Sequence, residues 1–351
     1  MKKISGRTWL SILTLLIIIL VLFVSRKELV HAWRLLHEVN IWVLVALLIP
    51  LQFLSYYAQG ETLFAYLRSQ GQGKRISPLG FARLSLEMNF VNHVLPSAGV
   101  SGMSYMGWRL KHFGVPLTRS TAAQLVRVVA TFGGYAVILG VAVLFMLLDG
   151  SLNRWISLVT AFLVVAIFGM IIGMIYMLEN NKKLPRLAKL LVGFANALIR
   201  IFTFGRIPRK ISSADPLIGF FAEVQKDYRK IMSNKKVLGL PIMWGVLFSL
   251  VEVAMFYSAF LSLGHPINPA PLVVAYGLAG AAAIFMVTPG GAGVYEVVMV
   301  GFLTVVGVDP RVGIAAIVLV RVLLMLGTIL AGYYFYQQAI LKHGKRTDTA
   351  T

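Results

Sequence analysis

Long, nearly uncharged segments dominate this chain and leave it few ways to fold. Hydrophobic residues make up 58% of the sequence and charged residues 13%, against roughly 25% charged residues in soluble domains. Several segments reach the ~20 apolar residues that a helix needs to cross a bilayer. In lipid, backbone polar groups must be satisfied within the protein, which favours helices. The sequence therefore predicts an all-α polytopic membrane protein, with a single membrane domain over residues 1–351.

The apolar segments divide into complete spans and interrupted ones. Two segments, 78–112 and 271–306, are apolar on both sides of a break rich in proline and glycine, and each flank is too short to cross. We expect both to form re-entrant helical hairpins, which are tolerated at membrane depth where protein or a water-filled cavity surrounds them. About six transmembrane helices are predicted, over residues 9–24, 41–59, 118–148, 155–178, 237–263 and 311–340.

Each of the two interrupted segments begins a sequence pattern that occurs twice in the chain. LPSAGVSG at 95–102 is followed by Gly114 and by LVRV at 125–128, and TPGGAGV at 288–294 is followed by Gly307 and by LVRV at 319–322. The offset is 193 residues and becomes 194 after one gap. We infer a first repeat over 41–148 and a second, inverted repeat over 237–341, joined by a connecting span and a basic cytoplasmic loop at 149–236. Inverted repeats are typical of transporters.

The positive charge lies between the spans. The formal net charge is +20, and its basic residues gather near both termini, in the loop at 68–75 and in the loop at 179–236. The positive-inside rule then predicts cytoplasmic N- and C-termini, with the turns near Asp149 and His265 outside. We expect the membrane to be the cytoplasmic membrane of a prokaryote. Such loops favour contact with anionic inner-leaflet lipids rather than nucleic acid.

Motifs for chemistry are missing from the sequence. It contains no cysteine, its histidines are scattered, and no HExxH, Walker or GxSxG pattern occurs. We therefore predict no enzyme activity, no cofactor and no metal site.

At two places the sequence resembles a known family. NHVLPSAG at 92–99 followed by Gly114, and PGGAGVYE at 289–296 followed by Gly307 and Arg321, resemble the transmembrane region of the lysylphosphatidylglycerol synthase family, whose members are also described as flippase-like integral membrane proteins. The resemblance covers most of the chain and implies lipid translocation. We expect no C-terminal aminoacyl-transferase domain, because the sequence ends at Thr351.

Arg127 and Arg321 are the leading candidates for substrate contact. Each lies about nine or ten residues into its span, roughly 14 Å deep at 1.5 Å per residue, where an unpaired charge is costly. Guanidinium groups match phosphate oxygens in bidentate fashion. The alternative is a structural pair with a buried carboxylate, Glu296 or Glu252.

Other residues complete the predicted substrate-binding set. Glu252 lies in mid-span, and Glu296 either caps a half-helix or carries a proton or cation. Asn92 and His93 are placed to hydrogen-bond across the first break. Glycines at the breaks allow close packing or expose N–H groups to an anion; they are Gly99, Gly290, Gly291 and Gly293.

Together with the resemblance, these features predict a lipid flippase. The resemblance implies that the substrate is an anionic phospholipid, an aminoacylated lipid or an isoprenoid-linked glycolipid, and we expect its headgroup to pass between the hairpins. Two alternatives stay open: an ion-coupled small-solute transporter, and a non-catalytic membrane scaffold for a lipid-modifying enzyme. Partners beyond the lipid would be that enzyme or a second copy in a homo-oligomer.

Overall fold

The described part of the chain folds entirely into helices. A computed structural model describes residues 26–35, 39–74, 76–95, 100–180, 215–284 and 293–343, with isolated positions elsewhere. In chain order, the helices are α2 (Arg26–Leu35), α3 (Ile41–Ser69), α4 (Pro78–Val94), α5 (Val100–His112), α6 (Leu117–Leu148), α7 (Arg154–Glu179), α9 (Asp215–Ser233), η1 (Lys235–Leu238), α10 (Gly239–Ser262), α11 (Pro269–Ile284), α12 (Val294–Val305) and α13 (Pro310–His343).

Membrane-spanning character is confirmed for most of the predicted spans. Within the described residues, five helical stretches are long and apolar enough to cross a bilayer: α3, α6, α7, η1–α10 and α13. They correspond to five of the six predicted spans. The remaining prediction, over 9–24, lies outside the described residues. The chain is thus an all-α membrane protein.

Helix α3 is longer than predicted. It begins at Ile41, where the Asn40 side chain accepts a hydrogen bond from the backbone N–H of Val43, and it continues to Ser69 instead of ending at 59. The extension contains Glu61, whose carboxylate pairs with Arg68 two turns later. Glu61 is buried, and the pairing with Arg68 offsets the cost of burying its charge.

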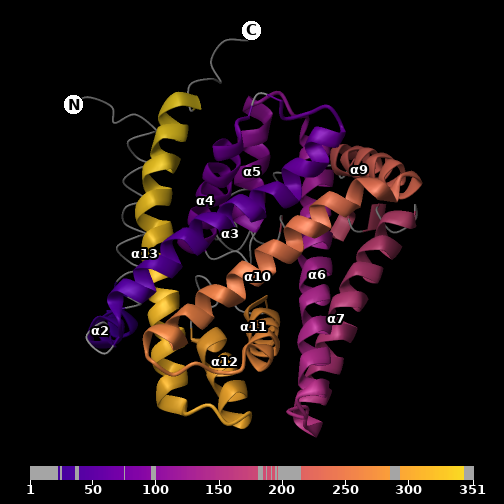
Figure 1. Cartoon of the computed structure of the whole chain (residues 1–351). Helices are drawn as coiled ribbons and strands as arrows, with labels where there is room; N and C mark the ends of the chain where they lie inside the picture. The colour runs from indigo at the N-terminus through magenta and orange to yellow at the C-terminus, as the bar shows by residue number, and fades with distance from the viewer. Residues whose placement is uncertain are drawn as a thin grey trace, which may run out of the picture.

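Each interrupted segment forms a pair of short helices. The first gives α4 and α5, and the second gives α11 and α12; the connecting residues 96–99 and 285–292 lie outside the described part. Figure 1 shows α4 and α5 toward one end of the molecule and α11 and α12 toward the other. The division of each segment into two helices is confirmed, while the conformation of the predicted breaks lies outside the described residues and re-entry into a membrane stays a prediction.

The repeated glycines form the same turn twice. Gly114 and Gly307 have φ values of 80° and 94°, in the left-handed region that glycine adopts without steric cost. The backbone N–H of the following residue bonds five residues back in both turns, from Val115 to Leu110 at 3.1 Å and from Val308 to Leu303 at 2.9 Å. Figure 1 places these turns at opposite ends of the molecule, as inverted repeats require.

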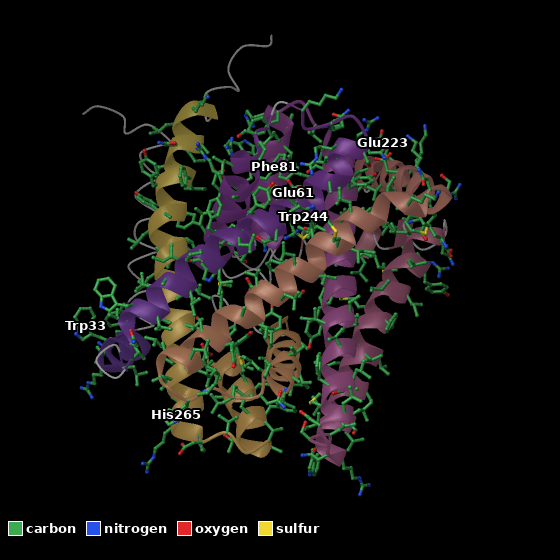
Figure 2. All side chains as sticks on the ribbon, viewed as in Figure 1. Trp33, Glu61, Phe81, Glu223, Trp244 and His265 are labelled. Atoms are coloured by element: carbon green, nitrogen blue, oxygen red, sulfur yellow. The ribbon has the colours of Figure 1, made fainter. Side chains whose placement is uncertain are left out.

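The turns predicted to be cytoplasmic and those predicted to be external lie at opposite ends of the molecule. The Asn268 side chain donates a 3.0 Å hydrogen bond to Asp149, so the α6–α7 and α10–α11 turns share one end. Figure 2 shows His265 at this end and Glu223 of α9 at the opposite, basic end. Helix α9 lies within the segment predicted as a loop, and its buried side chains Val224 and Tyr228 pack against the end of α7.

Helices α3 and α10 run obliquely across the molecule, side by side (Figure 1). Tyr57 and Trp244 pack edge to face between them, with ring centroids 5.6 Å apart. Helix α6 approaches α10 closely at Gly134 and Gly245, where an added Cβ would overlap the backbone of the other helix. Small residues at such crossings let helices pack by backbone contact. This packing fixes three walls of an internal cavity.

Candidate functional site

A cavity of about 830 Å³ lies in the middle of the molecule. Side chains from eight helices line it: α3, α4, α6, α7, α10, α11, α12 and α13. Its volume falls within the range of natural ligand pockets, roughly 300–1,000 Å³. Both halves of the predicted repeat therefore contribute to one space.

One wall of the cavity is the polar face of α3. Gln52, Ser55, Tyr56 and Gln59 all line it, and their spacing of three, four and seven residues places them on one side of a helix. Sequence reasoning missed this face, although a polar stripe in an otherwise apolar span was a signal that could have revealed it.

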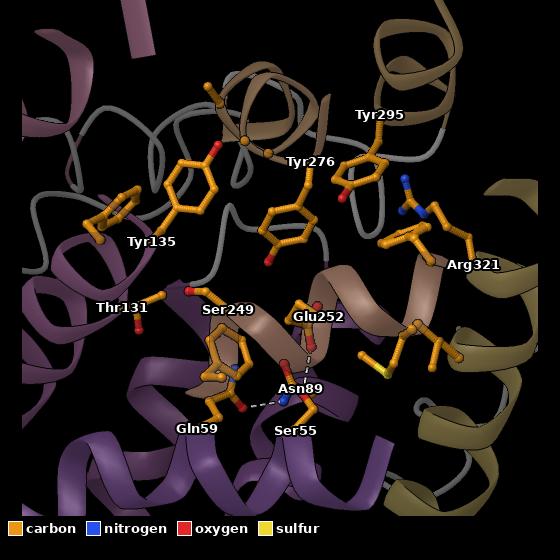
Figure 3. A pocket seen from close by; sticks show the side chains of 18 of the residues that line it. Ser55, Gln59, Asn89, Thr131, Tyr135, Ser249, Glu252, Tyr276, Tyr295 and Arg321 are labelled. Carbon is orange, nitrogen blue, oxygen red and sulfur yellow. Dashed lines mark hydrogen bonds between the residues drawn. The ribbon is translucent and has the colours of Figure 1, made fainter. Parts of the chain in front are cut away.

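Hydrogen bonds tie this face to its neighbours. Ser55 Oγ donates to Glu252 Oε1 at 2.6 Å, and Asn89 Nδ2 donates to Gln59 Oε1 at 2.6 Å; Figure 3 shows both. The hydroxyls of Tyr56 and Thr328 lie 2.6 Å apart. The polar wall is thus held by α4, α10 and α13 in a defined arrangement.

Arg321 lies on the opposite side of the cavity, on α13. Its Nη1 is 3.0 Å from Glu296 Oε1, and its guanidinium carbon is 4.3 Å from the centre of the Tyr295 ring. Both partners belong to the first turn of α12. The structural pair considered as an alternative for this arginine is therefore present, and the guanidinium also lines the cavity.

Glu296 is engaged through both carboxylate oxygens. While Oε1 faces Arg321, Oε2 accepts a 2.7 Å hydrogen bond from the backbone N–H of Gly293. Gly293 has a φ of 89°, so a glycine is favoured where α12 begins. Glu296 thus caps the helix and neutralises the arginine, which are two of the roles anticipated for it.

Glu252 has a different environment. It lines the cavity from α10, and Ser55 is its hydrogen-bond donor. Across the described residues, no basic side chain lies within ion-pair distance of this carboxyl group. Figure 3 shows Tyr276 pointing its hydroxyl toward it. Glu252 is therefore a carboxyl group that faces the cavity and has no cation beside it in the described part of the chain.

Asn92 and His93 have different positions relative to the cavity. Asn92 Oδ1 accepts a 2.8 Å hydrogen bond from the backbone N–H of Gly102, so it joins α4 to α5 across the break, and it is not among the cavity-lining residues. His93 lines the cavity, and its Nδ1 lies 2.9 Å from the carbonyl oxygen of Asn89. The predicted residues Gly99, Gly290 and Gly291 lie outside the described part.

Arg127 is not equivalent to Arg321 in this structure. It is half-buried one turn from Thr131, which lines the cavity, but does not line the cavity itself. Within the described residues, its Nε is buried without a hydrogen-bond partner and no carboxylate is within ion-pair distance. The repeat explains the difference, because the position aligned with Glu296 is Met103.

The wall on α7 is apolar. It consists of Phe162, Leu163, Ala166, Ile167 and Met170. Phe162 is 58% exposed, so the protein core does not pack tightly over it. The cavity thus combines a polar face on α3 and single polar groups on α10 and α13 with an apolar wall on α7.

A second polar cluster lies outside the cavity. Glu87 on α4 is fully buried and accepts hydrogen bonds from Arg83 Nε at 2.8 Å, Arg109 Nε at 2.7 Å and the Tyr105 hydroxyl at 2.8 Å. The cluster fastens α4 to α5. The sequence analysis did not predict this cluster, although the spacing of Arg83 and Glu87 four residues apart is typical of a helical ion pair.

Comparison with known proteins places this fold in a family. The family described as "Lysylphosphatidylglycerol synthase TM region" matches residues 9–332. A "UPF0104 membrane protein" of Methanothermobacter thermautotrophicus strain Delta H is 24% identical over 237 residues, which cover 66% of this chain and 67% of that protein. No solved structure matches the chain.

Proposed function

Because the chain belongs to the lysylphosphatidylglycerol synthase transmembrane-region family, we propose that it moves a lipid with an anionic, phosphate-bearing headgroup between the leaflets of a membrane. The observation that carries this proposal is the central cavity, where Arg321, paired with Glu296, lies across from the hydrogen-bonding side chains of Gln52, Gln59 and Asn89. The lipid leaves chemically unchanged, so the activity is transport and not catalysis.

Arg321 is the group suited to the phosphate. A guanidinium presents paired N–H donors that match two phosphate oxygens. Its partner in this structure, Glu296, also accepts a hydrogen bond from the backbone N–H of Gly293. The carboxylate therefore keeps this hydrogen bond when a phosphate replaces it at some of the guanidinium N–H groups. Gln52, Gln59 and Asn89 offer further hydrogen bonds to a polar headgroup.

The apolar wall on α7 suits the rest of a lipid molecule. Acyl chains gain no favourable interaction from entering a polar cavity, because bilayer lipid already solvates them. A route along Phe162, Ala166 and Met170 lets the chains remain in lipid while the headgroup crosses. A transporter of small solutes would need this side sealed by packed side chains, and the exposure of Phe162 favours the lipid.

Arg127 binds the phosphate in the other conformation, in which the cavity opens to the opposite side of the membrane. It occupies the position that the repeat aligns with Arg321, and it has no carboxylate partner among the described residues. Inverted repeats exchange their conformations during alternating access. In the proposed cycle, the phosphate passes from one arginine to the other.

The protein's location follows from the same proposal. The basic residues of α9 and η1 gather at one end of the molecule, and the positive-inside rule assigns such an end to the cytoplasm. We place the protein in the cytoplasmic membrane of a prokaryote, with both termini and α9 inside. There the basic end attracts anionic lipids toward the cavity.

Lipid movement can be measured in vesicles that contain the purified protein and a trace of phosphatidylglycerol labelled on one acyl chain with a fluorophore. Dithionite, which does not cross the bilayer, bleaches the outer leaflet. We expect the protected inner pool to be bleached as well, at a rate proportional to the protein content. An inner pool as stable as in protein-free vesicles would refute the proposal.

A further inference from the structure

The proposed function leaves Glu252 unexplained. A carboxylate in a largely apolar cavity without a cation beside it is costly, and taking up a proton removes that cost. Ser55 supplies a hydrogen bond to it, but one hydroxyl does not neutralise a charge. Glu296, by contrast, already has Arg321 and a backbone donor. The two acids of the cavity are therefore chemically distinct.

The surrounding groups restrict what else could titrate here. Tyrosines face the cavity from four helices, namely Tyr56, Tyr135, Tyr276 and Tyr295, and they are neutral near pH 7. Among the described residues, the other ionisable groups that line the cavity beside Glu252 are His93, Glu296 and Arg321. Glu296 and Arg321 neutralise one another, so a charge change near neutral pH involves Glu252 or His93.

An anionic headgroup alters this balance. With Glu252 ionised and His93 neutral, an anion at Arg321 would be the third negative charge among the described cavity groups, against one positive charge. With Glu252 protonated, the anion competes with Glu296 alone. Like charges in a space of low dielectric constant repel strongly. Binding of the anion and binding of the proton therefore favour one another.

We propose that Glu252 carries a proton across the membrane together with the anionic lipid, so that the protein is a proton–lipid symporter. This inference rests on the proposed lipid transport. One proton accompanies one monoanionic headgroup, and the loaded cavity keeps the charge of the empty one. Transport is then driven by a pH gradient and is insensitive to the membrane potential.

Glu252 suits a carrier because of its place in the fold. It lies where α10 runs beside α3, and the Ser55 hydroxyl joins the two helices at this point. These helices belong to different repeats. A proton on Glu252 changes the Ser55 hydrogen bond from one made to a charged acceptor to one made to a neutral acceptor, which weakens it. Loading thereby loosens a contact between the two halves.

The experiment measures how labelled phosphatidylglycerol distributes between leaflets in vesicles with an imposed pH gradient. We expect accumulation in the leaflet that faces the alkaline side, approaching about tenfold per pH unit for one proton per lipid. A potassium diffusion potential set with valinomycin should leave the distribution unchanged. Downhill flux that ignores the pH gradient would overturn the symport while sustaining lipid transport. Absence of flux would overturn both.

Variants assign the proton to one side chain. In Glu252→Gln, which keeps the acceptor for Ser55, whatever lipid movement remains should no longer depend on the pH gradient, whereas Glu252→Asp should retain the gradient-driven accumulation. The control Glu223→Gln changes an exposed carboxyl on α9 and should behave as wild type. Accumulation that persists in Glu252→Gln and disappears in His93→Gln would overturn the assignment.

A measurement on the wild type alone avoids the question of variant folding. Short-chain phosphatidylglycerol is added to the detergent-solubilised protein in weak buffer, and a pH-sensitive dye reports the protons taken up. At a pH where Glu252 is ionised before the lipid arrives, we expect uptake approaching about one proton per lipid bound. Binding without any uptake across pH 5 to 9 would overturn the proposal.

Discussion

Arg321→Ala is expected to lower the initial rate of lipid movement by about 10- to 100-fold. A hydrogen bond to a charged group contributes ~1.5–3 kcal/mol, and each ~1.4 kcal/mol corresponds to a factor of ten. The substitution removes the guanidinium that faces the cavity. Arg321→Lys, which keeps the charge but loses the paired donors, should fall between the alanine variant and wild type. The dithionite assay reads all three.

Two controls separate loss of the site from loss of the fold. Arg311→Ala removes an exposed arginine from the first turn of the same helix and should transport at the wild-type rate. Arg321→Ala combined with Glu296→Gln removes the carboxylate that the single substitution leaves unpaired, and should restore thermal stability without restoring transport. An Arg321→Ala protein that transports normally would show that the guanidinium is structural.

Glu87→Gln is expected to destabilise the protein by about 3–5 kcal/mol, the cost of breaking a buried ion pair from one side. Glu87 lies between Arg83 and Arg109, and Arg109 is 4% exposed. Without the carboxylate, the Arg109 guanidinium remains buried beside an uncharged amide. Denaturant unfolding in mixed micelles, followed by tryptophan fluorescence, measures the difference.

The same unfolding measurement on two further variants tests whether the lost stability comes from the unpaired buried charge. Glu223→Gln is the identical substitution at an exposed site and should change stability by less than about 0.5 kcal/mol. Glu87→Leu with Arg109→Met replaces both buried charges by apolar groups and should recover most of the loss, since Arg83 is partly exposed and keeps water around it. A wild-type midpoint for Glu87→Gln would contradict the described cluster.

Helix positions were largely predictable from the sequence. Helices α6, α7 and α13 begin within one residue of the predicted spans, because long apolar runs between polar turns leave little freedom in where a membrane helix begins and ends. The division of each interrupted segment into two helices was equally clear, since proline and glycine interrupt helices. Helix α9 was missed because its charge suggested a solvated loop.

The site was less predictable than the helices. Arg321 and Glu252 were identified because ionisable residues are rare inside spans. The polar face of α3 was missed because glutamine, serine and tyrosine are uncharged. A single uncharged polar residue is common in a membrane span and does not by itself indicate a site. Arg127 and Arg321 were treated as equals because both occur in LVRV. Their difference depends on Met103 and Glu296, which lie on neighbouring helices and not in that motif.

The proposed function requires that the cavity hold a lipid by its phosphate through Arg321. Native mass spectrometry of the protein purified in a mild detergent can detect such a lipid, with wild type, Arg321→Gln and Glu223→Gln compared side by side. We predict one phosphate-bearing lipid retained by wild type and by Glu223→Gln, and lost from Arg321→Gln. The same lipid retained equally by all three, or bulk lipid without preference, would contradict the proposed role of Arg321.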